Sequence, residues 1–151
     1  MGKFITEEGL KKIQDELTNR KVAVRQSIAA AIKEAKEQGD LSENAEYSEA
    51  KRQQAENEAR VAELEFMLKE STVVKYDKNS GGVQMGSTVK VKFNGSEMEF
   101  QIVGSNEADP ASMKISNESP MGKAFMGHAK GDKVDVTTPI GKTKYEILDL
   151  K

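Results

Sequence analysis

Two acidic side chains, Asp40 and Glu43, stand three residues apart in a short stretch that separates two long helical patterns. At that spacing across the start of a helix, both carboxylates can lie on the same side. Mg²⁺ typically binds one or two protein carboxylates and leaves its other positions to water and phosphate. The pair could therefore complete a magnesium site whose remaining ligands come from a partner or a substrate. The alternative is a solvated acidic helix start, which is common because the helix dipole favours it.

The charges around this pair separate into an acidic centre and basic shoulders. The acids are Glu37, Asp40, Glu43, Glu46 and Glu49, with no Lys or Arg between the first and the last, and the basic residues are Lys33, Lys36, Lys51 and Arg52. Basic side chains near the carboxylates could steady a phosphodiester backbone. Ordinary helix-surface charge explains each basic residue equally well when it is taken alone.

Other chemistry has little support in the sequence. There is no Cys, so a thiolate metal site, a disulfide or a Cys–His pair is excluded. The single histidine, His128, lies in a Gly-rich stretch, where a lone histidine is more often a surface residue than a general base. The net charge of −2 provides no basic field for duplex DNA, so any DNA or RNA binding must be local. Without a membrane-length apolar run or a signal-peptide core, we expect a cytoplasmic protein with no membrane partner.

Helical periodicity before the acidic stretch predicts one long helix. Apolar residues recur at steps of three, four and seven from Leu10 to Ala35, which is the spacing of a narrow seam. Thr6 is the predicted N-cap and Gly39 the predicted stop. The helix should span about Glu7–Gln38, or roughly 45–48 Å at 1.5 Å per residue.

A second helix is predicted to begin at the acidic stretch, with Ser42 as its N-cap. Its seam runs to Leu68 and has a polar middle, Gln54 and Asn57, which favours a thin two-stranded pairing over a bundle. A short connection makes the two helices antiparallel. The result is a helical hairpin whose far end, residues 39–44, we call the tip.

The composition changes near Ser71, where short β-prone segments and turns begin. Asn94-Gly95 predicts a tight hairpin turn, and Ser119-Pro120 predicts the start of a short helix. The predicted strands are 87–93, 97–103, 112–115, 132–137 and 143–150. The sequence therefore predicts an α+β protein, with an antiparallel coiled-coil hairpin in residues 1–75 and a small, mostly antiparallel β domain in residues 76–151.

Two blocks of sequence resemble a known family. The stretch Gly39–Tyr47 is similar to the tip motif of the bacterial Gre transcript-cleavage factors, a family of transcription elongation factors, and closest to its GreA branch. The blocks Ile102–Asp109 and Ile115–Ala124 resemble the family's C-terminal domain. Both parts stand in the family's order, so the resemblance covers essentially the whole chain.

The resemblance implies a fold and a function. The C-terminal domain is expected to be FKBP-like and to dock on RNA polymerase near its secondary channel, and the coiled coil is expected to enter that channel. The tip acids would then stabilise a second Mg²⁺ beside the ion of the polymerase and promote cleavage of backtracked RNA near its 3′ end. The protein alone would be inert and no enzyme, its partners would be RNA polymerase and the nascent RNA, and it would act as a monomer.

The resemblance also implies a role for each residue of this chain that matches a functional position of the family. Asp40 and Glu43 match the metal-stabilising acids of the family. The remaining matches are Asn44, Glu46 and Tyr47 for tip support or substrate placement, Lys51 or Arg52 for RNA contact, and Ser119 and Pro120 for polymerase docking. Ser42 and Ser48 stand where many relatives have bulkier polar residues, which affects the expected strength of RNA contact rather than the acid pair.

Two other functions compete with transcript cleavage. A regulator that occupies the secondary channel without inducing cleavage would need no acid pair. A coiled-coil adapter unrelated to transcription, or an FKBP-like prolyl isomerase, is the third possibility. The tip motif argues against the adapter, and the few aromatic residues of the β domain argue against an aromatic-lined isomerase pocket.

Overall fold

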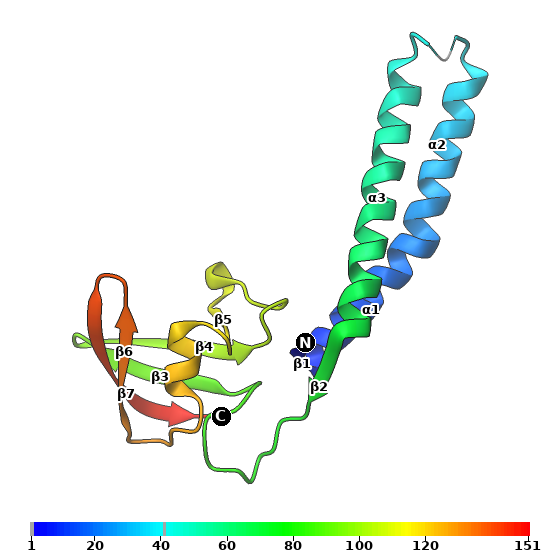
Figure 1. The fold of residues 1–151 in the computed structure, drawn as a ribbon. Helices are drawn as coiled ribbons and strands as arrows, with labels where there is room; N and C mark the ends of the chain where they lie inside the picture. The colour runs from blue at the N-terminus through cyan, green and yellow to red at the C-terminus, as the bar shows by residue number, and fades with distance from the viewer. Residues whose placement is uncertain (1, 41) are drawn as a thin grey trace. The chain divides into compact units, whose positions relative to one another are not determined.

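The computed structural model describes residues 2–40 and 42–151 and confirms an α+β fold (Figure 1). The chain forms two compact units, one of Lys11–Glu70 and one of Ser71–Lys151 together with the residues up to Leu10. We call these the hairpin unit and the β unit. The predicted domains are residues 1–75 and 76–151. That division places the first ten residues with the hairpin, whereas the structure groups them with the β unit.

The first arm of the hairpin is helical throughout but is not one uninterrupted α-helix. It consists of α1 (Glu7–Asn19), a π-helical segment η1 (Arg20–Val24) and α2 (Arg25–Glu37). The prediction of a single α-helix is therefore wrong over five residues. Short π segments inside α-helices are rare, and the apolar spacing that predicts the helix does not distinguish them.

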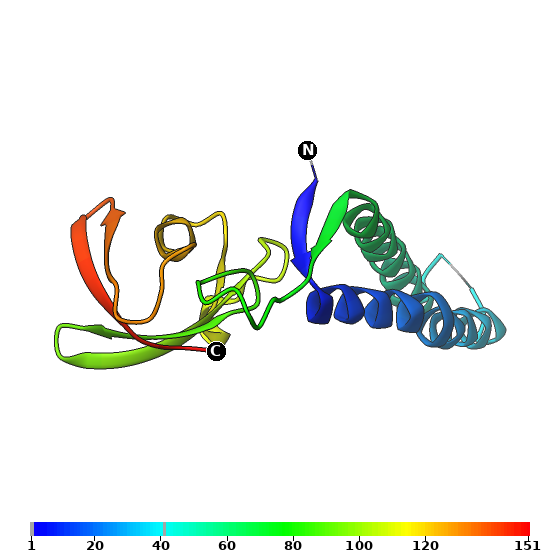
Figure 2. The same ribbon diagram turned by 90° about the horizontal axis from the view of Figure 1, so that it is seen from below.

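The second arm, α3 (Ala45–Glu70), lies alongside α2 in Figures 1 and 2. The interface between the arms is a narrow row of small and aliphatic side chains, as predicted. Its buried members are Ile13, Ile28, Ala35, Ala50, Val61 and Leu64. No helix within residues 2–40 and 42–151 is long and apolar enough to cross a membrane.

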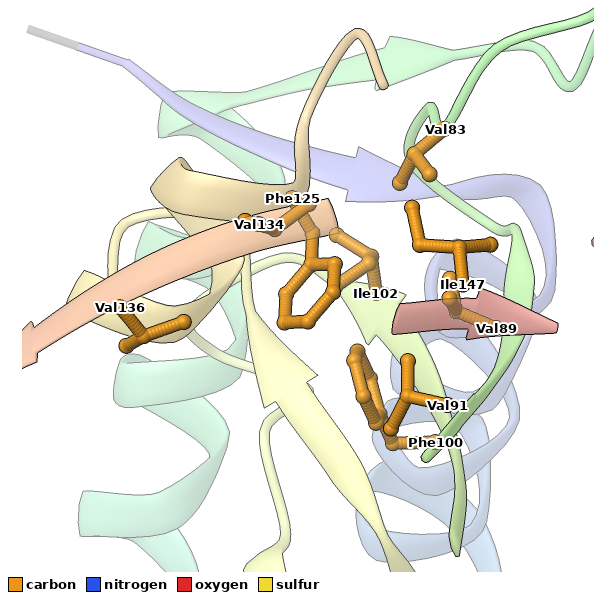
Figure 3. Packing of buried hydrophobic residues seen from close by; sticks show 9 residues of the cluster. All are labelled: Val83, Val89, Val91, Phe100, Ile102, Phe125, Val134, Val136 and Ile147. Carbon is orange, nitrogen blue, oxygen red and sulfur yellow. The ribbon is translucent and has the colours of Figure 1, made fainter. Parts of the chain in front are cut away.

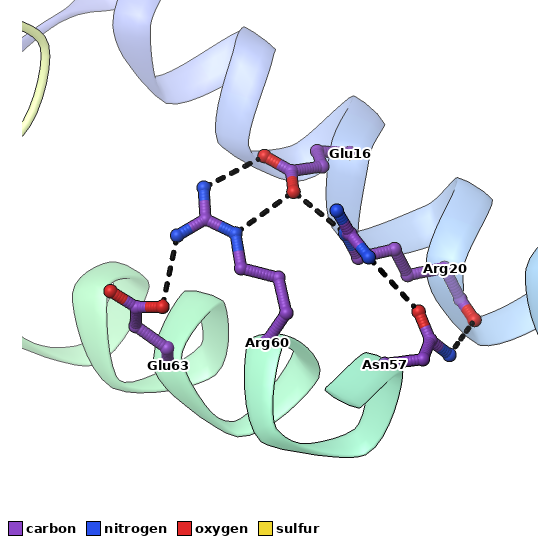
Figure 4. Close-up of polar contacts among 5 residues, drawn as sticks. All are labelled: Glu16, Arg20, Asn57, Arg60 and Glu63. Atoms are coloured by element: carbon purple, nitrogen blue, oxygen red, sulfur yellow. Dashed lines mark hydrogen bonds and ion pairs between the residues drawn. The ribbon is translucent and has the colours of Figure 1, made fainter. Parts of the chain in front are cut away.

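A polar cluster interrupts this row beside the π segment (Figure 4). Asn57 is 3% exposed; its Oδ1 accepts from Arg20 Nη1 at 3.2 Å, and its Nδ2 donates to the Arg20 carbonyl at 3.1 Å. The Glu16 carboxylate accepts from Arg60 at 2.9 and 3.0 Å and from Arg20 Nε at 2.7 Å. The hydrogen bond from Arg60 is the main cause that lowers the pKa of Glu16 to about 2. Glu63 accepts from Arg60 at 3.0 Å.

The β unit contains a five-stranded sheet in the order β5-β4-β3-β7-β6, in which only the β4–β5 pair is parallel. Its strands are β3 (Thr88–Phe93), β4 (Ser96–Val103), β5 (Lys114–Ser116), β6 (Lys133–Thr138) and β7 (Gly141–Leu150). A 3₁₀ turn, η2 (Pro110–Ser112), precedes β5. Each predicted strand is found, with ends that differ by a few residues. Asn94 and Gly95 both have positive φ, as a type I′ hairpin turn requires.

The short helix α4 (Pro120–Phe125) covers one face of this sheet (Figures 1 and 2). Phe125 packs edge-on against Phe100 of β4, with 5.1 Å between the ring centroids. The buried cluster in Figure 3 consists of Val83, Val89, Val91, Phe100, Ile102, Phe125, Val134, Val136 and Ile147. All members of this core lie within the β unit.

Two short strands complete the β unit. β1 (Lys3–Thr6) pairs in parallel with β2 (Ser71–Val74), in the register Lys3↔Ser71 to Thr6↔Val74. The β2 region was predicted as β-prone, whereas β1 was not predicted. The predicted N-cap is confirmed, because the Gly9 N–H donates to Thr6 Oγ1 at 3.0 Å.

Candidate functional site

The tip begins where α2 ends. Gly39 follows the last turn with a φ of +127°, in a region that residues with a side chain rarely adopt. A Cβ at this position would meet nothing within 4 Å. Glycine is therefore needed here for the backbone conformation and not for space, which confirms the predicted stop of the first helical arm.

Asn44 joins the two arms at the tip. Its Oδ1 accepts from the Tyr47 N–H at 3.0 Å and so caps α3, and its Nδ2 donates to the Ala35 carbonyl at 2.7 Å near the end of α2. One amide thus satisfies orphan backbone groups of both helices. The prediction of Ser42 as the N-cap is wrong; α3 begins at Ala45, directly after Asn44. We call this pair of Asn44 hydrogen bonds the tip clamp.

Ser42 instead supports the first of the two acids. Asp40 Oδ1 accepts from the Ser42 N–H at 3.0 Å and from Ser42 Oγ at 2.8 Å. The backbone hydrogen bond, followed by that of the hydroxyl, holds the pKa of Asp40 below its usual value. The same two hydrogen bonds fix the Asp40 carboxylate in a small local turn. Leu41, which belongs to the same motif, lies outside the described residues.

Both acids border one open hollow at the tip, with a volume of about 370 Å³. Its lining consists of Gln38, Asp40, Glu43, Asn44, Ala45 and Glu46. The hollow brings together the two predicted metal ligands and two of the three predicted tip-support residues. Tyr47, the third, contributes its backbone N–H to the tip clamp and its ring is half-buried.

The donor set fits a shared Mg²⁺ site better than a complete one. Asp40 and Glu43 offer hard, anionic oxygen atoms, which suit Mg²⁺. Across residues 2–40 and 42–151, no group of three or more His, Asp or Glu side chains is arranged to hold a metal ion. Two carboxylates leave most of an octahedral shell to water, phosphate or another protein.

Comparison with known proteins covers both halves of the chain. Residues 3–73 match the N-terminal domain family of the GreA/GreB transcription elongation factors, and residues 78–151 match the C-terminal domain family. A transcription elongation factor GreA from Acetivibrio thermocellus is 48% identical over 97% of this chain and 94% of its own length. The chain belongs to the GreA/GreB family. Its α+β architecture is in keeping with that membership.

Other GreA proteins are similar to the same extent. The GreA of Clostridioides difficile is 48% identical and covers 98% of this chain and 95% of its own length. Among solved structures, the GreA factor homolog 1 protein of Thermus thermophilus is 28% identical and covers 100% of this chain and 99% of its own, with a TM-score of 0.45.

The basic residues that follow the tip, Lys51 and Arg52, are held by contacts within their own helix. Lys51 Nζ donates to Gln54 Oε1 at 2.9 Å, and the Arg52 guanidinium pairs with Glu49 at 2.7 Å and Glu56 at 2.6 Å. Neither basic residue lines the tip hollow. Both are exposed, and exposed ion pairs contribute little and exchange readily with other partners. Their predicted contact with RNA stays a prediction.

Ser119 and Pro120 of the GreA/GreB C-terminal domain lie at the start of α4. Ser119 Oγ accepts from the Gly122 N–H at 3.0 Å and donates to the Ser116 carbonyl at 2.7 Å, so it is the N-cap. A Cβ on Gly122 would lie 2.0 Å from the Ser116 oxygen, so the approach of α4 to β5 requires glycine. These contacts shape the helix end that was predicted to dock on the polymerase.

Two features of the tip were not predicted. The first is the support of Asp40 by Ser42, for which the signal is the Asp-x-Ser spacing of an Asx turn. The second is the bond from Asn44 to the Ala35 carbonyl, nine residues earlier. No sequence pattern marks this second bond, because it depends on the antiparallel approach of the two arms.

Proposed function

We propose that the protein binds RNA polymerase and reaches its active site through the secondary channel with the tip. There it stimulates Mg²⁺-dependent cleavage of backtracked RNA, which allows arrested complexes to resume synthesis in the bacterial cytoplasm. The observation that supports this most is the placement of Asp40 and Glu43 on one hollow at the end of a helical hairpin. Membership of the GreA/GreB family makes transcription elongation the setting.

The roles of the tip residues follow from their contacts. Ser42 donates two hydrogen bonds to one oxygen of Asp40, which orient this carboxylate and lower its pKa. Glu43 offers a second carboxylate on the same hollow, and Asn44 holds the arms together beneath both acids. When bound between the tip and the polymerase, Mg²⁺ would act as a Lewis acid and lower the pKa of an attacking water.

The same contacts explain why the protein should be inert alone. Two carboxylates on an exposed turn form only part of a cation cage, so the tip would act in a site that the polymerase completes. The β unit, with Ser119 and Pro120 at the start of α4, would provide the docking surface. Lys51 and Arg52 would exchange their present partners for RNA phosphates, since their ion pairs are exposed.

A cleavage assay tests this proposal. Backtracked complexes with 5′-labelled RNA are incubated with Mg²⁺ and with the protein or a variant. We expect the protein to shorten the RNA, and Asp40→Asn or Glu43→Gln to abolish most of this stimulation. Glu37→Gln is the matched control, because Glu37 is an exposed acid of the last turn of α2 that does not line the hollow.

Two outcomes would contradict the proposal. The first is full stimulation by either acid variant, which would remove the pair from the mechanism. The second is inhibition of RNA synthesis by the wild-type protein without shortened products, which would identify it as a regulator that occupies the channel and does not promote cleavage.

A further inference from the structure

Glu107, which lies in the loop after β4, accepts three hydrogen bonds that the proposed function does not use. Its Oε2 accepts from the Thr6 N–H at 2.9 Å and from the Gly104 N–H at 3.0 Å. Its Oε1 accepts from the Thr6 hydroxyl. The carboxylate thereby connects two segments that are about one hundred residues apart in sequence and belong to the same compact unit.

The Thr6 hydroxyl links Glu107 to the first turn of α1. It donates to Glu107 and accepts from the Gly9 N–H at 3.0 Å, so the N-cap of α1 is itself held by the loop after β4. Thr6 is 8% exposed and Ile5, before it, is 1% exposed. The start of the first helical arm is therefore buried and fixed through a charge-assisted contact.

Two glycines make room for this contact. A Cβ on Gly9 would lie 2.1 Å from Glu107 Oε1, so a side chain there would push the carboxylate out of its present place. A Cβ on Gly104 would lie 2.0 Å from the Phe4 carbonyl oxygen. Glycine inside a helix weakens it, and Gly9 is inside α1. Its presence is explained by the space that the Glu107 carboxylate occupies.

We propose that Glu107 is a positioning residue: by holding the Thr6 cap it fixes the root of the arm, Lys3–Leu10, to the loop after β4 and so governs how the tip acids reach the polymerase active site. This inference rests on the proposed function for its consequence, but the contact itself can be tested without polymerase. α1 continues from this root into the hairpin unit without a break in helical structure. From this root, α1, η1 and α2 form a continuous helical path toward the tip.

An ion pair at the same root, between Lys3 and Glu118, provides a control. Lys3 Nζ lies 3.1 Å from Glu118 Oε2, and both side chains are about half exposed. Exposed pairs of this kind contribute little. Glu118→Gln keeps an oxygen that can accept from Lys3 and from Ser105, and should therefore leave the root unchanged, although it removes a carboxylate from the same region.

The first test is amide hydrogen exchange of the full-length protein. In Glu107→Ala we expect the amides of Thr6 and Gly9 to exchange about tenfold faster, as for the loss of a helix cap. Glu107→Gln keeps one oxygen acceptor and should give an intermediate change. The amides of Val89 and Phe100 in the sheet core should keep their protection, which verifies that the variants fold. Unchanged exchange at Thr6 and Gly9 in Glu107→Ala would overturn the proposal.

The second test is transcript cleavage at increasing protein concentration. For Glu107→Ala we expect the maximal rate to fall about tenfold, while the half-saturating concentration changes by less than about twofold, because a misplaced tip loses rate rather than docking. Glu118→Gln should match wild type in both. If exchange at Thr6 and Gly9 accelerates but the cleavage rate stays at the wild-type value, the positioning role is wrong. If wild type does not stimulate cleavage at all, the proposed function is wrong. The exchange result would still show whether Glu107 holds the Thr6 cap.

Discussion

Replacement of Asn44 by alanine tests whether the tip clamp is needed in addition to the acids. The variant removes the acceptor for the Tyr47 N–H, and loss of such a cap costs about 1 kcal/mol. It also removes the donor to the Ala35 carbonyl. The Ala35 carbonyl still accepts a hydrogen bond from the Gln38 N–H at 3.2 Å. The cost of losing the Asn44 donor is therefore about 1 kcal/mol, at the low end of the range for a buried polar group.

The sum, about 2 kcal/mol, corresponds to a roughly thirtyfold increase in local opening of the tip. We expect the amides of Tyr47 and Ser48 to exchange faster by about that factor, since Ser48 N–H bonds to the Asn44 carbonyl at the same helix start. An error of about 1 Å at a reacting centre can cost about a hundredfold in rate. Stimulated cleavage should therefore fall at least about tenfold although Asp40 and Glu43 are unchanged.

Two variants separate the parts of this effect. Asn44→Ser keeps an uncharged oxygen that can cap α3 but loses the amide donor to Ala35, so it should show about half of the free-energy change. Asn19→Ala makes the same chemical change at an exposed position of the first arm where the side chain caps nothing, and it should behave as wild type. Exchange at Tyr47 that is as slow in Asn44→Ala as in wild type would refute the clamp. Faster exchange with undiminished cleavage would refute its link to function.

Three further predictions concern single contacts. Ser42→Ala removes one of the two donors to Asp40, so the pKa of Asp40, measured by carboxyl-carbon NMR, should rise toward its usual value. The ion pair of Glu16 stabilises the hairpin above the ordinary pKa of 4.5, and this contribution is lost as the pH falls to about 2, so Glu16→Gln should unfold with a shallower pH dependence across that range in circular dichroism. Asn57→Ala removes the partners of the Arg20 carbonyl and of Arg20 Nη1, although Arg20 Nε keeps its bond to Glu16, and should destabilise the hairpin by about 1–3 kcal/mol in hydrogen exchange of α3.

Much of the fold could be predicted because local patterns and tertiary structure agree. The alternation of Val89 and Val91 with lysines places the valines in the core, and Asn94-Gly95 forms the expected hairpin turn. Gly39 stops the first arm at the expected place because its φ of +127° is forbidden to most residues. The alternating strand, the hairpin turn and the glycine stop each depend on residues that are neighbours in the sequence, so local sequence patterns predict them.

The features that escaped prediction depend on distant or competing partners. Both Ser42 and Asn44 are good N-cap residues; Asn44 takes the position because its amide can also donate to Ala35. The strand Lys3–Thr6 is only four residues long and exists through pairing with a segment near residue 71. The role of Glu107 follows from its contact with Thr6, which no local pattern reveals.

The π segment Arg20–Val24 is a further case of this kind. Its residues fit the helical spacing of the neighbouring turns, so periodicity alone predicts an α-helix. In the structure, the side-chain amide of Asn57 donates to the Arg20 carbonyl at the start of the segment. The partner again lies on the opposite arm, beyond the reach of a local pattern.

The Mg²⁺ dependence of stimulated cleavage tests the central claim most directly, namely that the tip contributes two carboxylates to a cation site completed by the polymerase. At saturating protein, the half-maximal Mg²⁺ concentration for cleavage should be at least about tenfold lower than for the polymerase alone, and Asp40→Asn should return it to the unstimulated value. The same half-maximal concentration for wild type and Asp40→Asn, with both stimulating cleavage, would contradict the account.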